Sequence, residues 1–346
     1  MKISNKVNSM QFSPIRRFNP FGFKAEADGK KVYHLNIGQP DVETPEVFMN
    51  AIRNYGNKVI AYAESGGIND LRDAVCDYFK AYGMNYDRDD IMVTTGGSEA
   101  LSMTFLTILN EGDEILIAEP FYTNYHTFAT AAGGVVVPIT TKAEDGYHYA
   151  KREQIEACIT PKTKAIIPVH IFGTPANMDK INEIAKKNNL YVIEDACQAI
   201  GAKYKDKMIG TLSDIACFSF FPTKNLGTYG DGGLITTNND NLATICRALK
   251  AHGSGENGEI AYNLLNNIEE EVKVDSQVDD TVYNPKKYYN YLIGHNSRLD
   301  ELHAGILNIK LNYLDEWNGK RNSIGYSDIF KVYSYRNYRE ILSSLL

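Results

Sequence analysis

The chain has 346 residues, of which 43% are hydrophobic and 23% charged, and this size is sufficient for one large domain with a smaller one beside it. The formal net charge is -7 and no basic cluster stands out, so neither nucleic acid nor an anionic membrane is expected as a partner. Residues 1–21 lack the apolar core of a secretory signal, and no segment approaches the roughly 18 apolar residues of a membrane span, so we expect a cytoplasmic protein.

Short apolar segments alternate with amphipathic ones between about residues 45 and 240. A helix is predicted where Leu101, Phe105 and Ile108 recur at helical spacing, and another over residues 177–189. Continuous apolar strands separated by helices indicate a mainly parallel sheet that is buried on both faces, and hence an α/β fold. The predicted strands cover residues 90–95, 114–120, 164–173, 190–196, 215–222 and 233–238.

The two ends of the chain have a different character. Residues 1–30 are polar and are expected to form an irregular arm. Residues 254–287 carry eight acidic side chains and three lysines, which predicts a solvated excursion, with a flap that contacts substrate or another subunit as the alternative. Apolar residues at helical spacing predict one long helix over residues 297–317. We therefore expect an arm with a small-domain segment over 1–44, a large cofactor-binding domain over 45–250, and the acidic insert, long helix and short small domain over 251–346.

Two predicted strands end in side chains that pyridoxal 5'-phosphate (PLP) chemistry requires. This cofactor needs a lysine that forms a Schiff base and then acts as a base, and a carboxylate that keeps the pyridine nitrogen protonated. Lys224 follows strand 215–222, and Asp195 ends strand 190–196. Ligands of open α/β sheets bind where such strand ends meet. In isolation, Lys224 could be a surface lysine and Asp195 a helix N-cap.

Other strand ends could hold the rest of the cofactor. In TTGGSEAL, Gly97 permits close backbone approach and Ser98 opens a helix whose free N–H groups suit a phosphate, although N-capping by Ser98 explains the pattern equally well. Tyr122 can cover the ring, or it can be a core or edge aromatic residue. Gln198, three residues after Asp195, could donate to the phenolic oxygen.

At these residues the chain resembles two branches of the fold type I PLP-dependent aminotransferases. Residues about 30–148 resemble the class I/II, aspartate-aminotransferase-like branch through NIGQPDVETP, AYAESGGINDLRDAV, VTTGGSEAL and EPFYTNY. Residues about 155–320 resemble the DegT/DnrJ/EryC1 branch of nucleotide-sugar aminotransferases through PVHIFGTPANMD, YVIEDACQAIGA, CFSFFPTKNLGTYGDGG and YYNYLIGHNSRLDELHAGIL. The resemblance implies a hybrid chain with a mainly parallel seven-stranded sheet, helices on both faces and a small, shortened α+β domain.

The resemblance also implies a role for each matching residue. Lys224 and Asp195 would be the catalytic residues, the first attached to PLP and the second paired with its pyridine nitrogen, and no metal is implied. Among the remaining positions, Gly97, Ser98 and Ser219 would bind the phosphate, Tyr122 would stack on the ring, Gln198 would bind the phenolic oxygen and Gly38 would approach the substrate. Tyr62 and Asn296 would reach the phosphate of a neighbouring subunit, which implies a homodimer with shared sites.

The resemblance implies amino transfer from an amino acid donor to a carbonyl acceptor. The arginine that binds a substrate α-carboxylate in the class I/II branch has no convincing match, since Arg336 and Arg339 lie outside its motif. We therefore expect a keto-sugar nucleotide as the acceptor, with an α-keto acid as the alternative. A non-catalytic PLP-binding or regulatory hybrid is a further alternative, and the presence of Lys224 counts against it.

Overall fold

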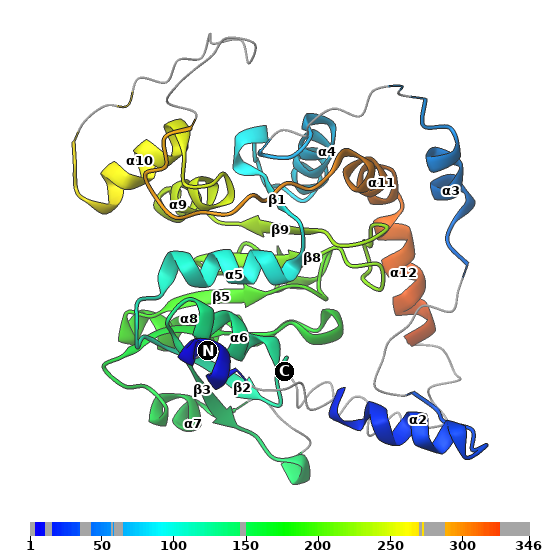
Figure 1. Ribbon diagram of the computed structural model, residues 1–346, viewed down its shortest axis with the longest axis horizontal. Coiled ribbons are helices and arrows are strands. Elements are labelled where there is room, and N and C mark those ends of the chain that lie inside the picture. The colour runs from blue at the N-terminus through cyan, green and yellow to red at the C-terminus, as the bar shows by residue number, and fades with distance from the viewer. Residues whose placement is uncertain are drawn as a thin grey trace.

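The computed structural model describes residues 4–10, 16–34, 43–56, 58, 65–145, 150–269, 272 and 288–325, and the statements below concern these residues. They form a layered α/β structure around one large sheet (Figure 1). In this part of the chain, no helix combines the length and the hydrophobicity that a bilayer span requires.

The large sheet has seven strands in the order β1-β9-β8-β5-β4-β2-β3. Only β9 runs antiparallel to its neighbours, which confirms the predicted mainly parallel sheet. One edge strand, β3, was absent from the predicted set; it contains Pro138, which is exposed and which an edge strand tolerates. The strands are β1 (Met92–Thr94), β2 (Glu114–Glu119), β3 (Val135–Thr140), β4 (Thr163–Ile167), β5 (Tyr191–Asp195), β8 (Ile215–Ser219) and β9 (Gly233–Thr236), and a separate hairpin pairs β6 (Lys203–Tyr204) with β7 (Lys207–Met208).

Helices cover both faces of the sheet because successive strand side chains point to opposite sides. In β2, Ile115 and Ile117 pack in one buried cluster and Leu116 in another on the opposite face. The first face is covered by α5 (Gly97–Ile108), α6 (Asn124–Ala131) and α9 (Asp240–Lys250). The second is covered by α4 (Asn69–Lys80), α7 (Arg152–Ala157), α8 (Met178–Asn188) and α11 (Glu301–Leu311). Burial on both faces explains why the strands read as continuous apolar segments.

The single long helix predicted over residues 297–317 is wrong. The structure has two helices there, α11 (Glu301–Leu311) and α12 (Leu314–Gly325). Asp300 starts α11, since its carboxylate accepts from the His303 N–H. Asn312 ends it, since its side-chain Nδ2 donates to the Asn308 and Ile309 carbonyls and replaces the hydrogen bonds of a continuing helix. Apolar spacing alone does not report such caps.

Two segments expected to be irregular contain helices. The arm includes α1 (Asn5–Ser9), a 3-10 turn (Arg16–Phe18) and α2 (Asn19–Ala27), and α3 (Glu46–Arg53) follows it. Pro20 lies in the first turn of α2, where its fixed φ and missing N–H cost little. The start of the acidic insert forms α10 (Gly255–Leu265), which packs on α9 and buries Gly258 and Ala261.

Candidate functional site

Four loops carry the sequence-predicted side chains to one edge of the sheet. They follow β1, β2, β5 and β8, which all run in the same direction. This edge is formed by the carboxyl ends of the parallel strands, where open α/β sheets bind ligands. The loops bring together Gly97 and Ser98, Tyr122, Asp195 and Gln198, and Ser219 and Lys224.

The Asp195 carboxylate is buried and held by two donors. Its side chain ends β5, with the residue 7% exposed. Oδ1 accepts from the Cys197 N–H at 2.9 Å, and Oδ2 accepts from the Tyr125 hydroxyl. Burial raises the pKa of Tyr125 well above its ordinary value and the Asp195 charge raises it further, so this phenol stays protonated as a donor. The carboxylate is thereby fixed in orientation as an acceptor.

Tyr125 was not among the predicted site residues. It lies three residues after Tyr122, within EPFYTNY, so the two tyrosines share one side of the start of α6. Their rings meet edge to face with centroids 5.8 Å apart. The helical spacing of the two aromatic residues was the signal in the sequence, but only the folded chain shows that Tyr125 binds Asp195.

Cys197 connects the ends of β5 and β8, since its N–H binds Asp195 and its thiol donates to the Cys217 carbonyl. Burial raises the pKa of the Cys197 thiol well above its ordinary value, the Asp195 carboxylate adds to the shift, and the Lys224 ammonium opposes it. Asp195 of β5 lies opposite Cys217 of the neighbouring parallel strand β8, and Lys224 lies five residues after the end of β8 at Ser219. Its own N–H donates to the Phe221 carbonyl at 2.8 Å, which shapes the turn after β8. The amine and the carboxylate thus lie in the same part of the sheet edge.

Gly97 lets the first turn of α5 pack closely against the ends of β5 and β8. A Cβ built there would lie 2.7 Å from Ser219 Cβ and 2.9 Å from Cys197 Sγ, so the first turn of α5 presses against the ends of β5 and β8. The free N–H groups of this turn favour an anion such as a phosphate. Gly96 is the N-cap, so the interpretation of Ser98 as a capping residue is wrong; Ser98 is exposed in the first turn.

Replacing Gly97 with alanine is expected to destabilise the protein by about 1–3 kcal/mol, because the added methyl group overlaps Ser219 and Cys197. The free energy of unfolding in denaturant measures this effect. Gly305→Ala is the matched control, since a Cβ at Gly305 in α11 meets nothing within 4 Å and should stabilise the helix by about 0.5–1 kcal/mol. Equal effects of the two substitutions would contradict the close packing at Gly97.

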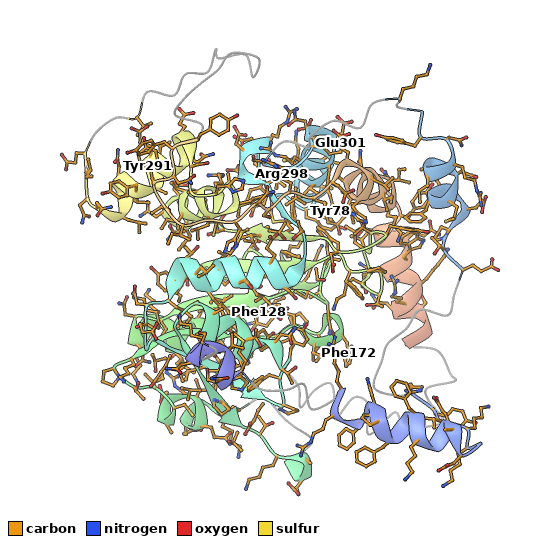
Figure 2. All side chains as sticks on the ribbon, in the orientation of Figure 1. Tyr78, Phe128, Phe172, Tyr291, Arg298 and Glu301 are labelled. Carbon is orange, nitrogen blue, oxygen red and sulfur yellow. The ribbon has the colours of Figure 1, made fainter. Side chains whose placement is uncertain are left out.

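Gln198 and Tyr122 flank the same edge. Gln198 Oε1 accepts from the Phe172 N–H at 2.9 Å, which fixes the amide next to an aromatic ring that is 87% exposed (Figure 2). Tyr122 is half exposed, and its hydroxyl accepts from Asn124 Nδ2 at 2.7 Å. The exposed ring faces of Tyr122 and Phe172 leave aromatic surface available to a planar ligand.

Three predicted residues remain, namely Asn296 and Tyr62, which were expected to reach a neighbouring subunit, and Gly38, which was expected to approach the substrate. Asn296 is exposed and pairs with Ala251 in an isolated antiparallel bridge. The next residue, Ser297, donates to Glu99 Oε2 at 2.6 Å, so this segment lies beside the first turn of α5. Gly38 and Tyr62 lie outside the described residues.

A buried hydrogen-bonded pair, His170 and Glu194, lies beside the site, since Glu194 directly precedes Asp195 in β5. This pair was not predicted. His170 Nδ1 accepts from the Ala176 N–H at 3.0 Å, so Nε2 carries the proton and donates to Glu194 Oε2 at 3.0 Å. Glu194 also accepts from Gly210 N–H, Leu212 N–H and the Ser213 hydroxyl. Burial alone would raise the pKa of Glu194, but these donors outweigh it and hold the pKa below its ordinary value.

Replacing Glu194 with alanine is expected to cost about 3–5 kcal/mol, because several buried donors lose their acceptor. A lowered folded-state pKa means that the carboxylate stabilises the native state fully above its unfolded value of about 4.3 and loses this effect as the pH falls through the folded value. Denaturation measured from neutral to acidic pH should therefore show the difference between wild type and variant shrinking in acid. A constant difference would contradict the ionised state of Glu194.

The chemistry of these donors fits PLP. The edge offers a lysine amine, a buried carboxylate, the N-terminus of α5 with hydroxyls from Ser98 and Ser219, and exposed aromatic rings. A polar depression of about 490 Å³ lies at the opposite edge of the sheet, lined by Ser213, Asp214 and residues 238–241. It contains neither a lysine nor an aromatic residue among its lining residues, so it does not offer the same chemistry.

Comparison with known proteins supports this interpretation. Residues 79–334 match the model of the DegT/DnrJ/EryC1/StrS aminotransferase family. The match therefore includes VTTGGSEAL and EPFYTNY and runs without a break through residues 148–155, so it does not show the expected hybrid of two branches.

Individual relatives agree with the family match. The chain is 40% identical over 226 residues to the "Pleiotropic regulatory protein" of Geobacillus stearothermophilus, covering 65% of this chain and 52% of that protein. It is 33% identical over 251 residues to the dTDP-3-amino-3,4,6-trideoxy-alpha-D-glucose transaminase of Streptomyces venezuelae, covering 72% and 55% respectively. A solved structure of NtdA from Bacillus subtilis with bound cofactor PMP has a TM-score of 0.58 and 28% identity, covering 78% of this chain and 53% of that one.

The chain spans about half the length of these curated relatives. The family model nevertheless matches more than half of the chain, from the end of α4 through α12. It includes the loops that carry Asp195 and Lys224. The chain therefore belongs to the DegT/DnrJ/EryC1/StrS aminotransferase family.

Proposed function

We propose that the protein is a PLP-dependent aminotransferase that transfers an amino group from an amino acid donor to a keto-sugar nucleotide. The observation that carries this proposal is the placement of the buried Asp195 carboxylate and of Lys224 on loops at the carboxyl ends of β5 and β8, which are adjacent parallel strands. Family membership and the PMP-bound neighbour support the choice of cofactor.

Each residue at this edge has a distinct role in the proposal. Lys224 holds the cofactor covalently and then carries the transferred proton on Nζ. Asp195 is kept in place by Tyr125 and Cys197 and supplies the negative charge that favours a protonated pyridine nitrogen. When bound, PLP supplies an electron sink for the substrate's Cα electrons.

The remaining site residues bind and orient in this proposal. The first turn of α5, Ser98 and Ser219 bind the phosphate, and Gly97 keeps that turn close to the strand ends. Gln198 binds the phenolic oxygen with its amide nitrogen, since its oxygen already accepts from the Phe172 N–H. Tyr122 covers the ring.

A keto-sugar nucleotide is favoured as the acceptor because a relative that is 33% identical is named as a transaminase of a dTDP-linked amino sugar. An α-keto acid is the alternative substrate. A non-catalytic, regulatory role is the other alternative, and the name of the Geobacillus relative provides the specific observation in its favour.

A transamination screen separates these alternatives. Purified protein is loaded with PLP and assayed with glutamate or glutamine against keto-sugar nucleotides and α-keto acids. We expect kcat/KM at least about a hundredfold higher for a keto-sugar nucleotide. A preference for an α-keto acid would favour the first alternative, and PLP binding without amino transfer would favour the regulatory one. Failure of the protein to bind PLP would contradict all three.

We further propose a homodimer whose sites are shared through Tyr62 and Asn296. The exposure of Asn296 on a segment beside the first turn of α5 supports this arrangement. If Asn296 acts in the partner's site, mixing Lys224→Ala and Asn296→Ala subunits should restore activity that neither variant has alone, because one site of each mixed dimer is intact. Sedimentation of an active monomer would contradict the shared site.

We also propose that residues 30–148 are of class I/II origin. In the same proposal the chain divides into an arm with a small-domain segment over 1–44, a PLP-binding domain over 45–250, and the insert, helices and shortened small domain over 251–346.

A further inference from the structure

The loop that carries Lys224 is held from one side by the C-terminal pair of helices. This loop, residues 220–232, connects β8 with β9. From α11, Lys310 Nζ donates to the Gly227 carbonyl at 2.5 Å, and the His303 carbonyl accepts from Thr228 Oγ1 at 3.1 Å. From α12, Asn318 Oδ1 accepts from Asn225 Nδ2 at 2.8 Å. Asn225 is the residue directly after Lys224, so the bond from α12 acts closest to the amine.

Asn318 also reaches the second segment of the site. Its Nδ2 donates to the Ile200 carbonyl at 3.2 Å, two residues beyond Gln198. Gly201 makes this approach feasible, because a Cβ there would lie 2.8 Å from Asn318 Nδ2, and its φ of +83° favours glycine. The Asn318 amide therefore connects the turn after Asp195 with the loop of Lys224, two segments that are distant in the sequence.

The helix that carries Asn318 is itself fixed to the body of the protein. Asp315, one turn earlier on α12, accepts from the hydroxyls of Tyr78 at 3.1 Å and Tyr82 at 2.5 Å on α4. Burial raises the pKa of Tyr78 and the Asp315 charge raises it further, so the phenol stays a donor. Figure 1 shows α12 descending from α11 beside the end of the sheet where the β8–β9 loop lies, and Figure 2 labels Tyr78 on α4.

We propose that Asn318 is a positioning residue that sets the place of the Lys224 amine relative to the Asp195–Gln198 turn. The proposal rests on the proposed function in one respect, namely that Lys224 is the residue that holds PLP. Asn318 does not reach the reacting atoms; it acts through Asn225 on one side and through the Ile200 carbonyl on the other.

An asparagine suits this position because its amide accepts and donates in one plane. Aspartate keeps the acceptor for Asn225 but has no donor for the Ile200 carbonyl. Alanine loses both bonds. The series Asn318, Asn318→Asp and Asn318→Ala therefore separates the link to the lysine loop from the link to the Gln198 turn.

The test uses the full chain with two measurements. The first is the fraction of Lys224 that becomes covalently attached to PLP on borohydride reduction, as a function of PLP concentration. The second, without cofactor, is the rate at which an amine-directed reagent modifies Lys224, divided by the rate for exposed Lys207 in the same sample. Asn312→Ala is the matched control, because among the residues that the structure describes the Asn312 side chain donates to main-chain carbonyls of α11.

Asn318→Ala is expected to weaken PLP attachment about tenfold and to change the labelling ratio of Lys224 several-fold, with Asn318→Asp in between. Loss of thermal stability without a change in either measurement, relative to Asn312→Ala, would overturn the inference and leave a purely structural role. If Asn318→Ala does not fold, Asn318→Asp supplies the same comparison. If the wild type fails to attach PLP while the labelling ratio still depends on Asn318, the proposed function is contradicted and the positioning role stands.

Discussion

Replacing Lys224 with alanine is expected to abolish covalent attachment of PLP and to lower the rate of amino transfer by about a thousandfold. The side chain supplies both the covalent link and the proton carrier, and removal of a positioned general base alone costs 10² to 10⁴ in rate, so about a thousandfold is a central value. The visible absorption of the bound cofactor and the turnover rate measure the two effects.

The fold should survive this change because Lys224 is half-buried in a loop whose other contacts remain. Lys207→Ala is the matched control, since that lysine is exposed on the β6–β7 hairpin away from the site. Colour and turnover retained in Lys224→Ala would exclude this lysine as the attachment point. Loss of both in Lys207→Ala would place the attachment point on the hairpin instead.

Replacing Asp195 with asparagine is expected to lower turnover by about a hundredfold. An opposite charge close to an ionisable nitrogen shifts its pKa by 1–3 units, so loss of the carboxylate disfavours the protonated pyridine by about ten- to a thousandfold. The shape of the side chain is kept, and an asparagine oxygen can still accept from Tyr125 or from the Cys197 N–H. Steady-state kinetics and the pH dependence of the cofactor's absorption report the change.

Two further variants define what this result means. Asp206→Asn makes the same chemical change at an exposed turn and should leave turnover unaltered. Tyr125→Phe removes one donor but keeps the charge, so it should reduce turnover only several-fold. If Tyr125→Phe proves as severe as Asp195→Asn, the hydrogen bond rather than the negative charge is the essential feature.

The sequence alone determined the layers of the fold and the residues at the sheet edge. Buried parallel strands are local features, since continuous apolar segments, turn residues and helix caps lie within a few residues of one another. The strand ends that carry Asp195, Ser219 and Lys224 follow from these patterns together with the rule for ligand sites in open sheets. The edge strand β3 was not predicted because Pro138 interrupts its apolar segment. The single helix predicted over residues 297–317 is two helices, because apolar spacing does not reveal the caps that separate them.

Only the tertiary structure decided which remote side chains meet. The Tyr125–Asp195 bond spans 70 residues of sequence, and the bonds from Asn318 to Asn225 and Ile200 span 93 and 118. Local periodicity specifies which face of a helix or strand is buried, but it does not specify which distant residue contacts that face. Strand order, the close approach at Gly97 and the anchoring of the lysine loop by α12 depend on how the elements pack together, because each contact joins segments that are neighbours only in the folded chain.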